Sequence, residues 1–135
     1  MGLVRPLDGH VELGVPSRGG VGYIPQRLGL VSNLSVQANV EMGVRVGLSR
    51  WYPPFFAVPK AQQRYAERAM EDLGIAHLAH HPVRILSGGQ QRRVATAKTV
   101  AQRPKLVLAD EFLGELDANG NLTEALAKAT AEFLV

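Results

Sequence analysis

Apolar and polar residues follow one another along the chain in patterns that predict strands towards its two ends and helices between them. Val21–Ile24 is a short apolar segment closed by Pro25, which predicts a strand. Residues 35–48 begin with a serine in the N-cap position and carry apolar residues at partly helical spacing, which predicts a helix. Lys60–Leu73 has a stronger helical pattern, because its apolar side chains gather on one face and Gly74 provides a stop.

The second half of the pattern predicts a helix followed by a buried strand. The helix spans Gln90–Gln102, keeps valine and alanine side chains on its inner face and stops before Pro104. Leu106–Ala109 is then a continuous apolar run, which is typical of a parallel strand covered on both faces. Further elements are a short strand at 10–13 and a last helix at 121–133. Strands and helices in this order predict an α/β fold.

Composition excludes several classes of protein. The 135 residues, 46% of them hydrophobic and 20% charged, suit one α/β domain, and the absence of cysteine excludes disulfides and thiolate metal sites. No apolar run reaches the ~20 residues needed to cross a bilayer, and the first residues lack the apolar core of a secretory signal. The net charge of +3 raises nucleic-acid binding, but without a Lys/Arg run or basic–aromatic interleaving a solvated basic surface is the preferred interpretation.

The clearest candidate chemistry lies at the start of the helix at 90–102. Ser87 and Gln90 have the spacing of a capping box, which by itself explains these two residues. It does not explain Gly88 and Gly89, because each glycine costs roughly 1 kcal/mol relative to alanine in a helix. Backbone N–H groups and the dipole at a helix start attract anions, and glycines let a phosphate approach the backbone. We therefore interpret this turn as a phosphate site.

Two carboxylates follow the predicted buried strand. Asp110 and Glu111 come directly after Leu106–Ala109, and carboxylates at the C-terminal edge of a parallel sheet can hold a hydrated Mg²⁺. The alternative is a charged pair that merely caps the strand. The glycine turn upstream favours phosphate chemistry over that alternative.

Four segments resemble motifs of ATP-binding cassette (ABC) ATPases, in the family's order. Residues 86–93 (LSGGQQRR) resemble the signature, 106–111 (LVLADE) the Walker B segment, 22–26 (GYIPQ) the Q-loop and 114–117 (GELD) the D-loop. The wording LVLADE-x-x-G-x-LD is most similar to the lipoprotein-release and macrolide-export branch. Phe112-Leu113 departs from the Pro-Thr pair that is usual there, whereas Leu116-Asp117 is kept.

The resemblance implies a role for each of these residues. Glu111 would be the general base that polarises the attacking water, and Asp110 would hold Mg²⁺ through water. Gln26 would reach towards the Mg²⁺ and the attacking water, although a solvent-exposed loop amide is the alternative. The turn from Ser87 to Gln90 would bind the γ-phosphate of ATP held by the opposite subunit, and Asp117 would belong to the D-loop.

The implied architecture is a partial ABC-type P-loop ATPase domain. About 1–34 and 104–135 would supply portions of the core sheet, and about 35–103 the helical signature subdomain and its helix. No G-x-x-x-x-G-K-[ST] phosphate loop occurs in the sequence, and the family's switch histidine would follow Val135. We therefore expect a central fragment of such a domain that by itself binds MgATP weakly and hydrolyses it hardly at all.

Three functions are open at this point. The chain is the ATP-binding subunit of an ABC transporter, or a truncated part of one, that couples ATP binding and hydrolysis to transport. Alternatively, it is a non-catalytic module that supplies the signature in trans to a partner ATPase. A nucleic-acid-associated ABC-type ATPase is suggested only by the basic pI, and the absence of coiled-coil heptads disfavours it.

The same resemblance implies partners and a location. We expect a second ABC ATPase subunit, identical or different, a transmembrane permease, ATP and Mg²⁺, and no nucleic acid. The chain would be cytoplasmic and peripheral, on the inner face of the cell membrane through the permease.

Two further segments leave alternatives open. Residues 51–56 (WYPPFF) cannot form a helix because two prolines interrupt them, and they form either a docking surface for the transmembrane partner or aromatics tucked over the core. His77, His80 and His81 have a spacing that suggests a metal, but no carboxylate accompanies them locally, so loop histidines are preferred.

Overall fold

The computed structural model describes residues 18–48, 51–53 and 55–109, together with residues 8, 12 and 14–16. The predicted last helix, and Asp110, Glu111 and Asp117, lie outside the described residues. Most of the strand predicted at 10–13 also lies outside them.

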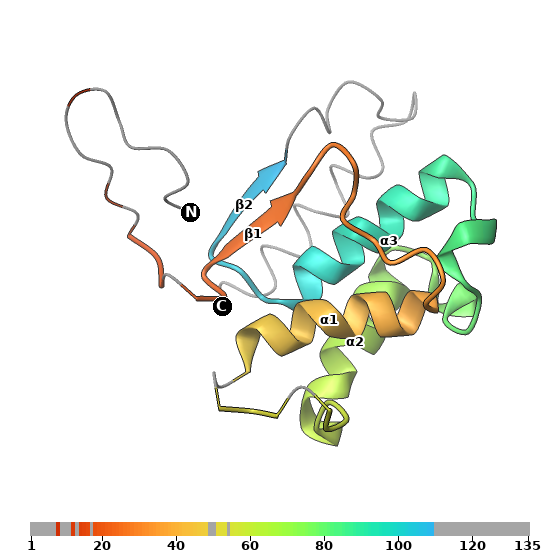
Figure 1. Ribbon diagram of the computed structural model, residues 1–135, viewed down its shortest axis with the longest axis horizontal. Helices are drawn as coiled ribbons and strands as arrows, with labels where there is room; N and C mark the ends of the chain where they lie inside the picture. The colour runs from red at the N-terminus through yellow and green to blue at the C-terminus, as the bar shows by residue number, and fades with distance from the viewer. Residues whose placement is uncertain are drawn as a thin grey trace.

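A two-stranded parallel sheet and three helices make up the described fold (Figure 1). The strands β1 and β2 pair in parallel from Val21↔Leu106 to Ile24↔Ala109, so both end at the same edge of the sheet. The elements in chain order are β1 (Val21–Ile24), α1 (Val36–Gly47), α2 (Lys60–Asp72), the 3₁₀ turns η1 (Ala76–Leu78) and η2 (Val83–Ile85), α3 (Gly88–Ala101) and β2 (Leu106–Ala109).

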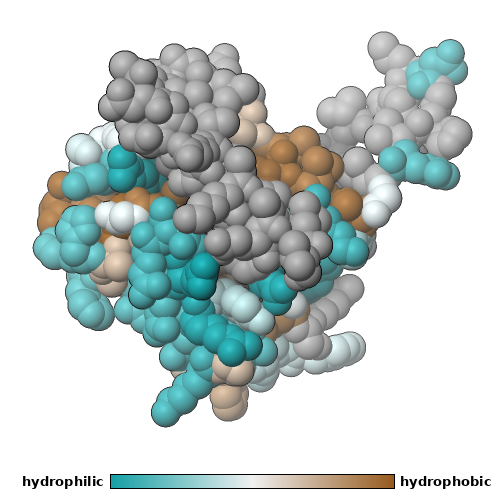
Figure 2. Space-filling view, turned by 180° about the vertical axis from the view of Figure 1, so that it is seen from behind, coloured by the Kyte–Doolittle hydropathy of each residue, from teal (hydrophilic) through white to brown (hydrophobic). Residues whose placement is uncertain are grey.

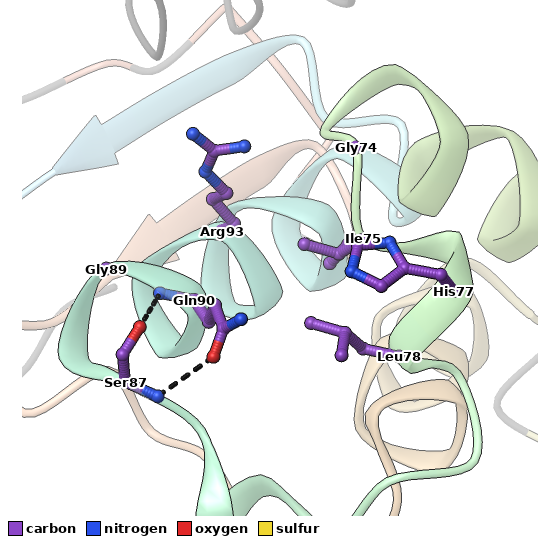
Figure 3. A pocket seen from close by; sticks show the side chains of 8 residues that line it. All are labelled: Gly74, Ile75, His77, Leu78, Ser87, Gly89, Gln90 and Arg93. Carbon is purple, nitrogen blue, oxygen red and sulfur yellow. Dashed lines mark hydrogen bonds between the residues drawn. The ribbon is translucent and has the colours of Figure 1, made fainter.

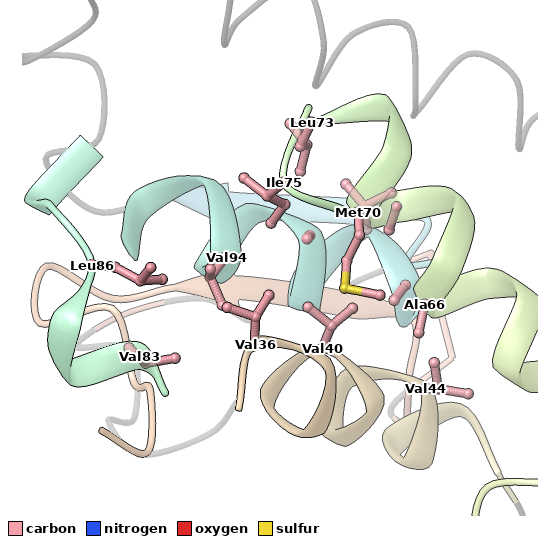
Figure 4. Close-up of a cluster of buried hydrophobic side chains, with 14 of the residues drawn as sticks. Val36, Val40, Val44, Ala66, Met70, Leu73, Ile75, Val83, Leu86 and Val94 are labelled. Carbon is pink, nitrogen blue, oxygen red and sulfur yellow. The ribbon is translucent and has the colours of Figure 1, made fainter. Parts of the chain in front are cut away.

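Helix α3 is the centre of the fold, because it packs on the sheet with one side and on α1 and α2 with the other. Ala95 and Ile24 form a small cluster between α3 and β1. Val94 joins the main core, where it is grouped with side chains of the other helices such as Val40 and Met70 (Figure 4). Full burial of one such aliphatic side chain stabilises the fold by about 2 kcal/mol. The core therefore fixes the direction in which α3 presents its first turn.

Two glycines permit close packing around α3. A Cβ atom at Gly43 in α1 would lie 1.8 Å from the backbone oxygen of Lys98 in α3. At Gly22 in β1 it would lie 2.6 Å from the Thr99 side chain. Real Cβ atoms do not come this close, so both positions need glycine for packing.

The predicted elements at 21–24, 35–48, 60–73 and 90–102 are confirmed to within two residues at each end. The Leu106–Ala109 strand and its parallel pairing are also confirmed, but the prediction that both its faces are covered is wrong. Val107 packs against the cluster on the α3 side, whereas Leu108 on the opposite face is 37% exposed. Its neighbour in the register, Tyr23, is 50% exposed. The described helices thus cover one face of the sheet.

The aromatic segment at 51–56 is non-helical, as its prolines predict. The interpretation that its aromatics fold back over the core is wrong for three of them, because Trp51, Phe55 and Phe56 are 90%, 95% and 63% exposed. Val58 is buried and ties the end of the segment to the core.

Figure 2 shows a face with a broad hydrophilic area, on which hydrophobic residues occupy separate places. Among the described residues no helix is long and apolar enough to cross a membrane. In the same part of the chain His77, His80 and His81 belong to no group that could hold a metal ion.

Candidate functional site

The turn before α3 has the geometry of a complete capping box. Ser87 is the N-cap in an extended conformation (φ −63°, ψ 158°). Its Oγ accepts a hydrogen bond from Gln90 N at 3.3 Å, and Gln90 Oε1 accepts one from Ser87 N at 3.0 Å (Figure 3). These two bonds hold the turn in one shape and explain why serine and glutamine stand three residues apart.

Neither the backbone conformation nor the packing of the described residues requires glycine at the two positions between Ser87 and Gln90. Gly88 and Gly89 begin α3, neither has a positive φ, and no atom of the described residues lies within 4 Å of where a Cβ would be added. Ser87, Gly88 and Gly89 are exposed. Because neither backbone conformation nor packing requires glycine here, the space around the two backbones is free for a ligand or a partner.

The first turn of α3 also has the electrostatics of an anion site. At a helix start the N–H groups of the first residues have no intrahelical acceptor, and the capping box satisfies only that of Gln90. The first turn contains no acidic side chain, and Arg92 and Arg93 follow one turn later. The helix dipole and these cations favour a negative group at the turn.

A pocket of about 320 Å³ opens beside this turn. Figure 3 shows Gln90 between Ser87 on one side and His77 and Leu78 of η1 on the other. The residues that line the pocket come from the α2–η1 connection and from the start of α3: Gly74, Ile75, His77, Leu78, Ser87, Gly89, Gln90 and Arg93. The turn is thus at the rim of a hollow, not on a flat surface.

Gln26 lies in a separate loop, just past the end of β1, and is exposed. The loop turns sharply, with a hydrogen bond from Leu28 N to the Pro25 oxygen at 2.8 Å and with Leu28 and Gly29 both at φ 58°. A positive φ is costly for leucine, so the surrounding contacts must hold the loop in this shape.

One of these contacts comes from α3. Lys98 Nζ donates a hydrogen bond of 2.8 Å to the backbone oxygen of Gly29. Burial lowers the pKa of the Lys98 ammonium. Lys98 lies about 15 Å along the helix from the Ser87–Gln90 turn, since each residue rises 1.5 Å. Helix α3 therefore connects the Gln26 loop to this turn.

Asn39 is the second contact, and it is fully buried. Its Oδ1 accepts from Val31 N at 2.8 Å, and its Nδ2 donates to the Val31 and Ser35 oxygens at 3.0 Å each. Because a buried amide is costly unless its hydrogen bonds are made, these bonds fix the chain between the Gln26 loop and α1.

Asp110 and Glu111 follow Ala109, the last residue of β2, and lie outside the described residues, as does Asp117. In the structure β2 ends at Ala109, which pairs with Ile24 of β1. Gln26 comes two residues after Ile24, so it follows the same edge of the sheet.

Sequence reasoning missed the contacts of Asn39 and Lys98. It also did not predict that His77 and Arg93 line the pocket. Asn39 left a signal, because it is a polar residue on the same helical face as Val36 and Val40. The Lys98–Gly29 contact joins residues 69 positions apart and leaves no local pattern.

Comparison with known proteins decides the family. Residues 2–114 match the family model described as ABC transporter. The chain belongs to the ABC transporter family. Its α/β fold is part of an ABC P-loop ATPase domain, as the motifs predicted.

Among proteins of known sequence, ABC subunits of an importer are similar to the chain. The phosphonates import ATP-binding protein PhnC of Escherichia coli O6:K15:H31 (strain 536 / UPEC) is 42% identical over 101 residues. That match covers 75% of the chain and 38% of the relative, and PhnC of Shigella dysenteriae serotype 1 (strain Sd197) gives the same values. The chain therefore spans well under half of these ABC proteins.

Solved ABC structures share the fold. An inward-facing ABC transporter described as of the metal-chelate type has a TM-score of 0.75 and 27% identity, over 97% of the chain and 51% of that protein. CbiO1 from Clostridium perfringens, part of the ABC transporter complex CbiONQ, has a TM-score of 0.66 and 28% identity, over 85% of the chain and 44% of that protein.

Proposed function

We propose that the chain is a portion of the ATP-binding subunit of an ABC transporter, in which the Ser87–Gln90 turn binds the γ-phosphate of ATP held by a second ATPase subunit. The observation that carries this proposal is the pair Gly88 and Gly89, which begin a helix, need no glycine for the fold and have open space around them. Two glycines lower the stability of a helix, and a phosphate that must approach the backbone closely explains why they are present.

The chain's own groups suffice to recognise a phosphate at this turn. The N–H groups of Gly88 and Gly89 donate to its oxygens, and the Ser87 hydroxyl can donate its proton while its oxygen stays in the capping box. Arg93 on the pocket rim adds positive charge. A phosphate has room beside this turn, because no atom of the described residues lies within 4 Å of where a Cβ would stand at either glycine.

The catalytic assignments belong to the same proposal. Glu111 would act as the general base for the attacking water, Asp110 would hold Mg²⁺ through water, and Asp117 would lie in the D-loop. Mg²⁺ would neutralise charge on the phosphates when bound. The order of the motifs along the sequence supports these assignments. Gln26 supports them too, because it is exposed and follows β1 at the edge of the sheet where β2 also ends.

We propose that hydrolysis needs parts that these 135 residues do not carry. No phosphate-loop motif occurs in the sequence, and the backbone cradle and lysine of that loop grip the β- and γ-phosphates in P-loop ATPases. The isolated chain would then act only by supplying its turn in trans.

The cargo has two candidates. The wording of residues 106–117 resembles the lipoprotein-release and macrolide-export branch, whereas the PhnC relatives are named for phosphonate import. We favour import of a phosphonate, because the likeness to PhnC extends over 101 residues. The permease would hold the subunit at the inner face of the membrane.

An ATPase measurement tests the trans role. A homologous ABC ATPase subunit that has a phosphate loop is assayed with and without the chain, and the chain should raise its turnover. Gly89→Asp should abolish the rise, because a carboxylate would repel the phosphate, although aspartate in the first turn favours the helix. Gly14→Asp is the matched control, since Gly14 also has open space but lies outside the turn. Stimulation that survives Gly89→Asp would refute the proposal.

A chimera tests the cargo. The matching 101 residues of PhnC are replaced by those of the chain in an Escherichia coli strain that needs PhnC to grow on a phosphonate. Growth supports phosphonate import. Failure to grow by a chimera that still hydrolyses ATP would contradict it.

A further inference from the structure

The loop between α1 and α2 exposes aromatic side chains that the proposed nucleotide site does not use. Trp51, Phe55 and Phe56 are 90%, 95% and 63% exposed within six residues of one another. Large apolar side chains that gather at the surface mark a site of interaction. This group is called the aromatic patch below.

The loop that carries the aromatic patch is held in shape by its own hydrogen bonds. Tyr52 Oη donates to the Ala57 oxygen, and Phe56 N donates to the Pro53 oxygen at 3.2 Å. Arg45 Nη2 donates to the Phe56 oxygen at 2.8 Å, and Val58 anchors the loop in the core. The rings are therefore presented on a folded loop with part of its backbone satisfied, which lowers the cost of taking them out of water.

Basic residues flank the aromatic patch in the sequence, and carboxylates are absent from this stretch. Arg45 bonds the loop directly, and Lys60 and Arg64 are exposed in the first turns of α2. No Asp or Glu occurs between Glu41 and Glu67. Tryptophan and phenylalanine beside Lys and Arg match the boundary of an anionic bilayer, where rings enter the headgroup region and cations meet lipid phosphates.

The aromatic patch lies apart from the Ser87–Gln90 turn. The start of α1 neighbours the segment before that turn, since Val36 N donates to the His81 oxygen. The aromatic patch follows the other end of α1, which is 12 residues, or about 18 Å, away (Figure 1). Both surfaces can thus be occupied at once.

We propose that the aromatic patch binds the surface of an anionic phospholipid bilayer, with Trp51, Phe55 and Phe56 in the headgroup region and the nearby cations on lipid phosphates. This contact is independent of the proposed nucleotide function. It would orient the chain on the membrane by direct contact with lipid.

The single tryptophan of the chain reports on this binding. Vesicles of phosphatidylcholine with phosphatidylglycerol should shift the Trp51 emission to shorter wavelength and sediment the chain, more weakly at high salt. Phe55→Ser/Phe56→Ser should lower the partition coefficient at least tenfold, and Lys60→Gln about fivefold, since each basic residue near an anionic surface contributes about a factor of five. Ile85→Ser is the control, because it removes an apolar side chain that is 57% exposed elsewhere.

Three outcomes would overturn the proposal. One is an unshifted emission with anionic vesicles, and another is equal partitioning of the double phenylalanine variant. The third is an emission shift that appears without lipid, either on raising the chain concentration or on adding single-stranded DNA, because the aromatic patch would then bind a second copy or a nucleic acid. Circular dichroism of each variant confirms that its helices are intact.

Discussion

Replacing Gly88 and Gly89 by alanine should stabilise the folded chain and weaken its contact with ATP. Both residues are in the first turn of α3, neither has a positive φ, and in the part of the chain that the structure describes a Cβ at either position meets no atom within 4 Å. Alanine therefore brings no clash, and it removes the extra conformational freedom that glycine has in the unfolded chain.

The expected gain is about 0.5 kcal/mol for each substitution, the low end of the glycine-to-alanine range, because helix ends are less constrained than helix interiors. The double variant should gain about 1 kcal/mol, which raises Tm by roughly 4 °C for a domain of this size. Urea unfolding followed by circular dichroism gives the free energy of unfolding, and the slope m should stay constant.

Gly47→Ala is the matched control for nucleotide binding. Gly47 ends α1, and its added Cβ would make only an ordinary contact, 3.5 Å from the Gln102 oxygen. This variant should keep full stimulation of a partner ATPase, whereas the double variant at 88 and 89 should lose most of it. A loss of stability in the double variant would refute the reasoning, because the fold itself would then require the two glycines.

Three other predictions follow from the packing and the loop contacts. Gly43→Ala should lower the free energy of unfolding by about 3 kcal/mol in urea, because its Cβ would clash with the Lys98 oxygen, and a neutral result would show that α1 and α3 are less close. Asn39→Ala should cost about 2 kcal/mol, since it removes the hydrogen bonds between its fully buried amide and the N–H and C=O of Val31, and should speed amide exchange at 27–35; unchanged exchange there would contradict its role in holding this segment. Burial lowers the pKa of Lys98, so the unfolded chain binds more protons between that lowered value and 10.5, and stability from this residue rises with pH across that window. Lys98→Met should lack this rise when the two chains are compared by urea unfolding at several pH values, and parallel curves would argue against a buried ammonium.

Local patterns were enough to predict the described strands and α-helices. Ser35 and Ser87 are N-caps, Gly74 ends its helix at φ 66°, and the strands at 21–24 and 106–109 are where the apolar runs indicated. Each of these depends on the chemistry of a few consecutive residues, so the sequence carries it directly.

Contacts between distant segments could not be predicted in this way. No local pattern indicates that Lys98 bonds Gly29 or that Gly43 lets α1 approach α3, because these contacts depend on how the elements are placed relative to one another. The exposure of Leu108 was mispredicted for a related reason, since an apolar strand is covered only where a second layer packs against that face.

In the candidate site, too, local features were predictable and contacts between distant segments were not. The turn from Ser87 to Gln90 was predicted down to its two hydrogen bonds, because a capping box is local. His77 and Arg93 joined it only in the structure, since the pocket is formed by segments from two parts of the chain. The roles of Glu111, Asp110 and Asp117 remain predictions from the family motifs.

The central claim is that the glycine turn of α3 completes a phosphate site on another subunit, and ATP-dependent association measures this directly. Sedimentation of the chain with a homologous phosphate-loop subunit, made unable to hydrolyse ATP, should show a heterodimer with MgATP and separate monomers with MgADP. Gly89→Asp should abolish the heterodimer, and Gly14→Asp should leave it intact. Association that is equal with both nucleotides, or that persists in Gly89→Asp, would contradict the account.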